Sequence, residues 1–70
     1  MTQNEMIIEY LKEHKTMTPI DAFYEIGCMK LATRIGELKR EGYNIETKME
    51  NYVTWRGEKK RHARYILHEH

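Results

Sequence analysis

Hydrophobic residues recur with a helical period over the first part of the chain. Ile7, Tyr10 and Leu11 fall on one face of a helix that is expected to end near residue 14. Thr2 and Glu5 match a capping box, in which each side chain accepts a hydrogen bond from the backbone N–H group of the other residue. The pattern therefore predicts a first helix that begins after Thr2 and is stabilised by packing of its apolar face.

Two further short helices are predicted between residues 18 and 42. Thr18 is a suitable N-cap, and Pro19 suits the first helical position, where no backbone N–H donor is needed. Gly27 can adopt the left-handed conformation that commonly ends a helix. The expected apolar faces are Ala22, Phe23 and Ile26 in the first of these helices, and Leu31, Ile35 and Leu38 in the second. Two helices joined by so short a turn predict a helix-turn-helix, whose second helix can enter the major groove of DNA.

The period of the hydrophobic pattern changes to two after residue 44. Apolar or semi-apolar residues then alternate along an expected strand: Ile45, Thr47, Met49, Val53 and Trp55. A charged turn over residues 56–60 and a returning strand over residues 61–68 complete a β-hairpin, which must pack on the helices because an isolated hairpin is marginally stable. Trp55 is expected to cover the small core. The sequence thus predicts an α+β fold of three helices followed by a two-stranded hairpin, in a single domain over residues 1–70.

Composition limits the classes of protein that fit. The one cysteine excludes an intramolecular disulfide and, with five methionines, favours a reducing cytoplasm over secretion. The longest apolar runs are three residues, so neither a transmembrane helix nor a membrane partner is expected. We expect no catalytic, cofactor or metal site, because nucleophile signatures, phosphate-binding glycine loops and metal-ligand spacings are absent. Cys28 is expected to be a buried residue in the turn. The spacing of His68 and His70 would allow at most weak binding of a metal ion.

Charge is distributed unevenly along the chain. Residues 1–29 contain two lysines and five acidic residues, whereas residues 30–70 contain ten Lys or Arg residues and six acidic residues. The second part is therefore basic although the net charge of the whole chain is +1. This asymmetry favours a face that meets a polyanion, and the alternative is a chance imbalance in a small domain.

The basic residues gather in two places that suit contact with DNA. On the second helix of the helix-turn-helix, the candidate contacts are Lys30, Thr33, Arg34, Glu37 and Arg40. Arginine is the commonest specific reader of guanine, and Arg40 is expected on a flanking phosphate. In the hairpin, the candidate contacts to phosphates or to the minor groove are Arg56, Lys59, Lys60, Arg61 and Arg64. The alternatives are a solvated helix face, on which Arg34 pairs with Glu37 or Glu41, and a hairpin edge protected by charge.

Gly36 is unusual because a glycine inside a helix costs roughly 1 kcal/mol relative to alanine. It is expected to mark a close contact with a neighbouring helix or strand. The alternative is a place where a DNA backbone approaches the helix.

A helix, a helix-turn-helix and a basic hairpin follow one another in the order of a winged helix-turn-helix domain. The stretch MTPIDAFYEIGCMKLATRIGELKREGYNI resembles the small helix-turn-helix proteins of bacteriophages and prophages. The matching residues are Thr18, Pro19, Ala22, Leu31, Ala32, Arg34, Ile35, Leu38, Gly42, Tyr43, Asn44 and Ile45. The ending HARYIL is similar to the K/R-A-R-Y-x-L ending of that family. The resemblance implies a winged helix-turn-helix fold with a short edge strand between the first two helices. It also implies a small transcriptional regulator or an accessory factor in excision or recombination.

Together these features predict a non-enzymatic cytoplasmic protein that binds double-stranded DNA. A homodimer is expected, because a single small module reads few base pairs. One alternative is a protein-interaction module that binds a host or phage protein, which the low net charge and the acidic residues Glu37 and Glu41 favour. Another is binding of single-stranded nucleic acid through Tyr52 and Trp55.

Overall fold

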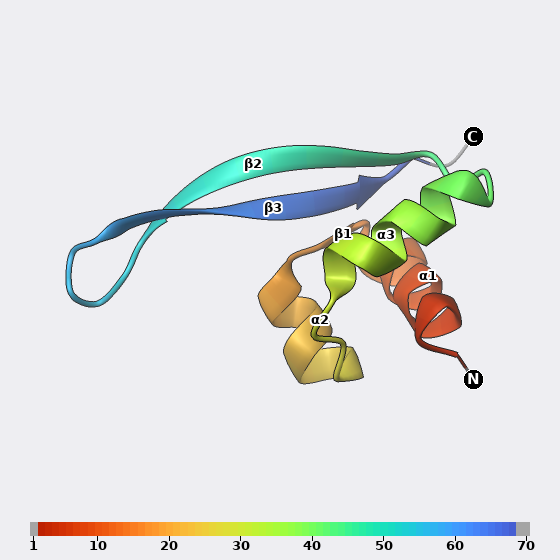
Figure 1. Cartoon of the computed structure of the whole chain (residues 1–70), viewed down its shortest axis with the longest axis horizontal. Helices are drawn as coiled ribbons and strands as arrows, with labels where there is room; N and C mark the ends of the chain where they lie inside the picture. The colour runs from red at the N-terminus through yellow and green to blue at the C-terminus, as the bar shows by residue number, and fades with distance from the viewer. Residues whose placement is uncertain (1, 69–70) are drawn as a thin grey trace.

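A computed structural model describes residues 2–68 of the chain (Figure 1). The elements follow one another as α1 (Gln3–His14), β1 (Thr16–Met17), α2 (Pro19–Ile26), α3 (Leu31–Arg40), β2 (Ile45–Val53) and β3 (Lys59–Leu67). The α+β class and the order of helices and strands are confirmed, and β1 is the short edge strand.

The helix ends are those that the sequence predicts. Thr2 Oγ1 accepts a hydrogen bond from the Glu5 backbone N–H at 3.1 Å, and the Glu5 carboxylate accepts one from the Thr2 backbone N–H at 3.3 Å. Thr18 and Asp21 form the same reciprocal pair at the start of α2. Gly27 ends α2 with a φ of 77°, a left-handed conformation that glycine adopts without a steric cost. Local hydrogen bonds therefore fix where α1 and α2 begin.

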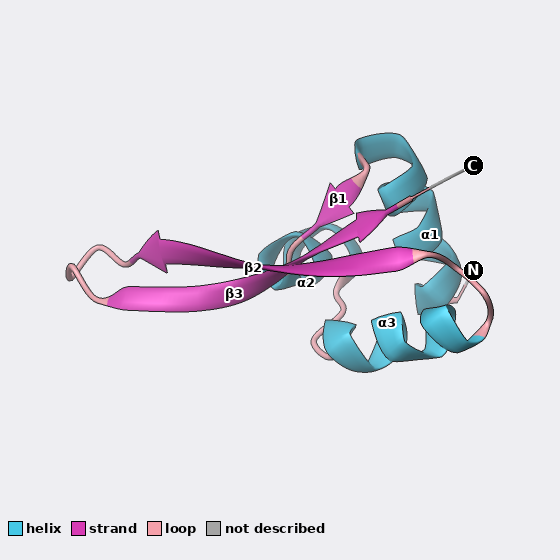
Figure 2. Ribbon diagram, turned by 90° about the horizontal axis from the view of Figure 1, so that it is seen from above, coloured by secondary structure: helices cyan, strands magenta, loops and turns pink. Residues whose placement is uncertain are grey.

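The three strands form one antiparallel sheet in the order β1-β3-β2. Only the base of the sheet lies against the helices, and the rest of β2 and β3 extends beyond them as a long twisted ribbon (Figures 1 and 2). The two strands of the ribbon are displaced from their expected positions: β2 ends at Val53 instead of Trp55, and β3 begins at Lys59 instead of Arg61, because Val53 pairs with Lys59. The turn therefore covers residues 54–58 instead of 56–60, and it is closed by a 2.9 Å hydrogen bond from Thr54 N to Glu58 O.

The core lies where the three helices meet the base of the sheet. Its buried hydrophobic residues are Ile7, Ile8, Leu11, Met17, Ala22, Cys28, Leu31, Ile35, Leu38, Ile45, Tyr65 and Leu67. The expected apolar faces of α1 and α3 are thus confirmed, and so is the buried position of Cys28. Burial of these side chains fixes the orientation of α3 and holds the root of the ribbon.

Two aromatic residues expected in the core are exposed instead. Phe23 is 51% exposed, because it lies about 100° around α2 from Ala22, and Ala22 is the residue that faces the core. Trp55 is 90% exposed, because it lies in the turn beyond the end of β2, where strand alternation no longer applies. Both rings remain on the surface and are available for contacts outside this chain.

Leu11→Ala is expected to lower the free energy of unfolding by about 2–5 kcal/mol, since Leu11 is fully buried and its truncation leaves a cavity in the core. A domain of this size has about 3–5 kcal/mol in total, so the variant should be largely unfolded. Urea titration followed by far-UV circular dichroism measures the change. Tyr24→Ala, at a position that is 79% exposed, is the control and should shift the value by less than about 0.5 kcal/mol. Equal losses in both variants would contradict this assignment of the core.

Candidate nucleic-acid interface

The outward face of α3 is the first part of the candidate interface. Leu31, Ile35 and Leu38 turn inward, which leaves Lys30, Thr33 and Arg40 exposed on the opposite side. Within the described residues, Lys30 and Arg40 have no ion-pair partner. α3 lies in front of α1 and the root of the ribbon in Figure 1, so no other element covers this face. The helix therefore presents two unpaired cations and a hydroxyl to solvent.

Gly36 lies in the middle of the same helix. A Cβ atom at this position would meet only the Arg40 side chain, at 3.9 Å from its terminal nitrogen, which is ordinary van der Waals contact. The expected close packing against a neighbouring helix or strand is therefore wrong. The absence of a side chain instead leaves a gap in the α3 surface beside Arg40.

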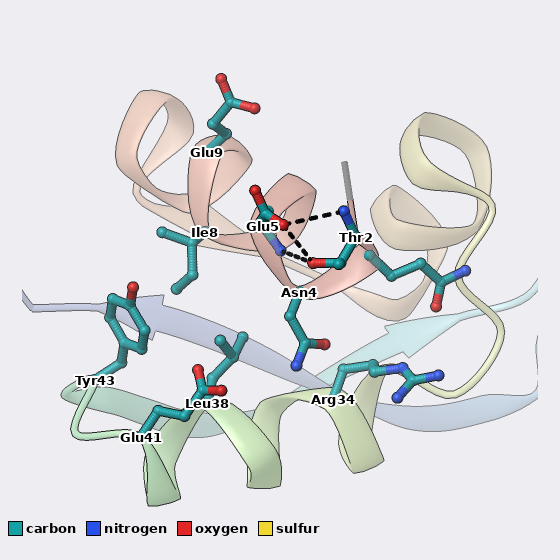
Figure 3. A pocket seen from close by; sticks show the side chains of 10 residues that line it. Thr2, Asn4, Glu5, Ile8, Glu9, Arg34, Leu38, Glu41 and Tyr43 are labelled. Atoms are coloured by element: carbon teal, nitrogen blue, oxygen red, sulfur yellow. Dashed lines mark hydrogen bonds between the residues drawn. The ribbon is translucent and has the colours of Figure 1, made fainter.

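Arg34 and Glu37 turn toward α1 and pair with each other. Arg34 Nη1 lies 3.1 Å from Glu37 Oε1, and Asn4 Nδ2 reaches from α1 to donate to the same oxygen at 3.1 Å. Figure 3 shows Asn4 and Arg34 along the hollow between α1 and α3. The hydrogen bond from Asn4, followed by that from Arg34, holds the pKa of Glu37 below its usual range. The pairing of Arg34 with Glu37 is thus present. The negative charge of the Glu37 carboxylate is largely balanced by these contacts within the protein.

The ribbon divides its basic residues between two faces. Lys59 and Arg61 lie on the face that begins with Ile45 and Leu67 in the core, as the cross-strand register shows. They have no ion-pair partner within residues 2–68. Lys60 and Arg64 alternate onto the opposite face. The structure therefore brings Lys59 and Arg61 together and separates them from Arg64.

Arg64 belongs to a network that spans all three strands. Its Nε donates to Glu50 Oε1 on β2 at 2.8 Å, and its Nη1 donates to Thr16 Oγ1 on β1 at 3.0 Å. His62 Nε2 lies 3.1 Å from the same Glu50 oxygen, and the Tyr52 ring stacks on His62 with centroids 5.0 Å apart. These residues hold the sheet together and leave Arg64 little freedom to contact another molecule.

Hydrogen bonds from Arg64 and then from His62 hold the pKa of Glu50 below its usual range. Stability from these contacts is therefore present at neutral pH and is lost as the pH falls through that lowered pKa. Sequence reasoning missed the roles of Glu50 and His62, which face each other only because the turn lies at residues 54–58.

The remaining basic candidates lie at the tip of the ribbon. The Arg56 guanidinium lies over the Trp55 ring, 5.0 Å from its centroid, and Lys60 Nζ lies 3.6 Å from Glu58. Both contacts are exposed, where such pairs contribute little to stability and exchange readily with other partners. The tip thus combines an exposed indole with positively charged side chains that make only exposed contacts within the chain.

No group of three or more potential metal ligands occurs within the described part of the chain. His68 Nε2 lies 2.7 Å from Glu46 Oε1. His70, which was considered with His68 as a loose metal site, is outside the described residues. None of the helices between residues 2 and 68 has the length and apolar character needed to cross a bilayer.

Comparison with known proteins agrees with this arrangement. A sequence profile described as a winged helix-turn-helix domain matches residues 2–70. No curated protein and no solved structure matches the chain significantly. The helix-turn-helix of α2 and α3, the β2–β3 wing and a profile match over nearly the whole sequence lead to one conclusion: the chain belongs to the winged helix-turn-helix domain family.

Proposed function

We propose that this protein binds double-stranded DNA, with α3 in the major groove and the wing on the flanking backbone. The proposal rests on which charged side chains of α3 are paired within the protein and which are not. Lys30 and Arg40 are exposed and unpaired among the described residues, whereas Glu37, which would repel phosphate, is held by Asn4 and Arg34. The exposed face of α3 is therefore effectively cationic, as contact with a polyanion requires.

The proposed contacts fall into two groups. We propose that Lys30 and Thr33, which are exposed at the N-terminal end of α3, contact base edges, and that Arg40 contacts an adjacent phosphate. On the wing, the proposed phosphate contacts are Lys59 and Arg61, with Arg56 and Lys60 at the tip. Arg34 contributes to base reading only if it leaves Glu37, and Arg64 only if it leaves Glu50.

The same surface supports a sequence-specific role. The resemblance to small phage and prophage proteins favours a transcriptional regulator or an accessory factor in excision or recombination. A second module, in a dimer or a longer assembly, would extend the short site that one α3 helix reads.

Titration of a labelled random-sequence duplex at two salt concentrations, followed by fluorescence anisotropy, tests the proposal. We expect micromolar binding that weakens steeply with salt, because phosphate neutralisation releases counterions. No binding at low salt would overturn the proposal and favour the alternative module that binds a host or phage protein. Tighter binding to a single-stranded oligonucleotide than to the duplex would place the chain among single-strand binders instead.

Lys59→Ala is expected to weaken binding to all duplex sequences alike and to lower the salt slope by about one unit, since one phosphate contact is lost. The control is Lys12→Ala, which removes the same charge from an exposed position on α1 that is not among the proposed contacts. Anisotropy titrations at four or more salt concentrations measure both slopes. If the two variants have the same slope, Lys59 does not contact phosphate.

Gly36→Ala is expected to raise the free energy of unfolding by up to about 1 kcal/mol, because alanine is the better helix former and its Cβ fits the space. The same variant is expected to bind duplex DNA more weakly, because the added methyl group fills the gap through which DNA approaches the α3 backbone. Urea titration and anisotropy measure the two effects separately. Increased stability with unchanged affinity would show that Gly36 does not lie against DNA.

A further inference from the structure

The outer edge of β2 carries backbone groups that no other strand of the described chain pairs. His68 N–H donates to Asn44 O, and Thr54 N–H donates to Glu58 O, each at 2.9 Å, just beyond the two ends of the β2–β3 ladder. These bonds set the alternation along the ladder, so even-numbered residues of β2 turn their N–H and C=O groups toward β3. Odd-numbered residues turn theirs outward, because β2 is the last strand of the sheet. The outward residues are Ile45, Thr47, Met49, Asn51 and Val53.

The helices leave this edge open. Beyond its root, the ribbon is clear of all three helices (Figures 1 and 2). At the root, Lys39 Nζ of α3 donates to Thr47 Oγ1 at 3.3 Å, which is a contact between side chains. The outward N–H and C=O groups of Thr47 therefore stay unpaired within residues 2–68, and those farther along β2 face solvent.

β2 also lacks the features that usually protect an edge strand from pairing with another chain. It is nine residues long, it pairs with β3 without a bulge, and it contains no proline. The opposite edge of the sheet differs, because β1 covers part of it and the open residues 59–64 of β3 include four Lys or Arg residues and no acidic residue. Two such basic edges would repel each other, whereas β2 carries charges of both signs.

The charges on β2 select one register for pairing with a second copy. In an antiparallel pair centred on Met49, Lys48 of each copy lies opposite Glu50 of the other copy. A pair centred on Lys48 would oppose two lysines, and a pair centred on Glu50 would oppose two glutamates. The register centred on Met49 also matches all nine residues of the strand. Its other outward pairs are Ile45 with Val53 and Thr47 with Asn51.

The side chains of Lys48 and Glu50 are free to make this contact. Lys48 is exposed and has no ion-pair partner within the described residues, and its neighbour across the ladder is another cation, Arg64. Glu50 receives the bonds from His62 and Arg64 at Oε1, so its Oε2 can accept from a further donor. An ion pair between Lys48 of one copy and Glu50 of the other therefore costs neither copy an existing contact.

We propose that two copies of this chain associate through β2, as antiparallel edge strands related by a two-fold axis at Met49. Each pair of opposed outward residues exchanges two backbone hydrogen bonds, as in other cases of strand addition. Met49, which is 50% exposed in the single chain, packs against Met49 of the second copy. Both copies use the same surface, so the assembly closes at a dimer with one continuous sheet.

This inference specifies the interface of a dimer that would lengthen the DNA site, but it rests on the sheet and not on DNA binding. The proposed DNA contacts on α3 and β3 lie outside the outer edge of β2. The interface is small, and we expect a dissociation constant between about 10 µM and 1 mM, as for other transient interfaces. The experiments therefore use protein without DNA, so this inference and the proposed function can fail separately.

A cysteine at position 49 tests the two-fold axis directly. Cα atoms of a hydrogen-bonded antiparallel pair lie about 5.5 Å apart, within the range that a disulfide spans. Met49→Cys should therefore convert most of the protein to a covalent dimer under mild oxidation, as seen by non-reducing gel electrophoresis. Cys28 is buried, so the wild type should not form a covalent dimer.

Thr47→Cys and Asn51→Cys are the matched controls on the same edge. In the proposed register, neither position lies opposite itself, so each variant alone should form little covalent dimer. Positions 47 and 51 do lie opposite each other, so an equal mixture of the two variants should form the covalent dimer readily.

Asn51→Pro tests the backbone contact without an added thiol. The Asn51 N–H points away from β3, so a proline there removes no hydrogen bond within the sheet and blocks strand addition at the outer edge. The sedimentation coefficient of the wild type should rise between about 5 µM and about 1 mM, and that of Asn51→Pro should stay at the monomer value. Tyr24→Ala, at an exposed position on α2, is the control and should behave as the wild type.

If circular dichroism shows that Asn51→Pro is unfolded, Lys48→Glu replaces it. Lys48 is exposed, and its reversal opposes Glu50 of the second copy. This variant should therefore also remain monomeric over the same concentration range.

Four results would overturn the proposal. The wild type could remain monomeric up to about 1 mM. The blocking variant could associate as the wild type does. Met49→Cys could form no more covalent dimer than Thr47→Cys or Asn51→Cys, which would show that β2 does not pair in this register. The wild type could form a continuing series of larger species, which would assign the contact to β2 of one copy and β3 of the next.

Discussion

The fold depends on burial of one face of α1 between α3 and the base of the sheet. Ile7 and Leu11 are fully buried there, and they meet the buried residues of α3 and the Met17 side chain of β1. In a chain of 70 residues, few other contacts compensate for the loss of conformational entropy on folding. The direction in which α3 faces and the direction in which the ribbon leaves the domain both follow from this packing.

Charged residues of this protein divide into those that hold the fold and those that are free. Arg64 and Glu50 join β3 and β2 to the edge strand β1. Arg34 and Glu37 join α3 to the start of α1. Lys30, Arg40 and Lys59 have no such partners among residues 2–68. Counting the basic residues therefore overestimates the surface that can bind a polyanion. The positions of the acidic partners decide which basic side chains remain free to bind it.

The sequence was sufficient for features that depend on local interactions. The capping boxes at Thr2 and Thr18 and the left-handed Gly27 fix helix ends without reference to the rest of the chain. The position of the ribbon turn was not predictable in this way, because the charged segment offers several turns and long-range pairing decides among them. A displacement of two residues changes which side chains face each other, so the contact of Glu50 with His62 was missed. Phe23 was misplaced because α2 has only eight residues and a narrow buried face.

The ribbon is anchored to the core only at its root, and this has a consequence for the motion of the chain. Ile45, Tyr65 and Leu67 are buried, whereas the positions beyond Ala63 toward the turn are mostly exposed. Backbone pairs near the tip can therefore open without disturbing a single core contact, and amide hydrogen exchange should become slower step by step from the turn toward the helices. The wing and the helical body behave as two units of different stability, and a bound partner can order the outer unit while the inner one stays unchanged.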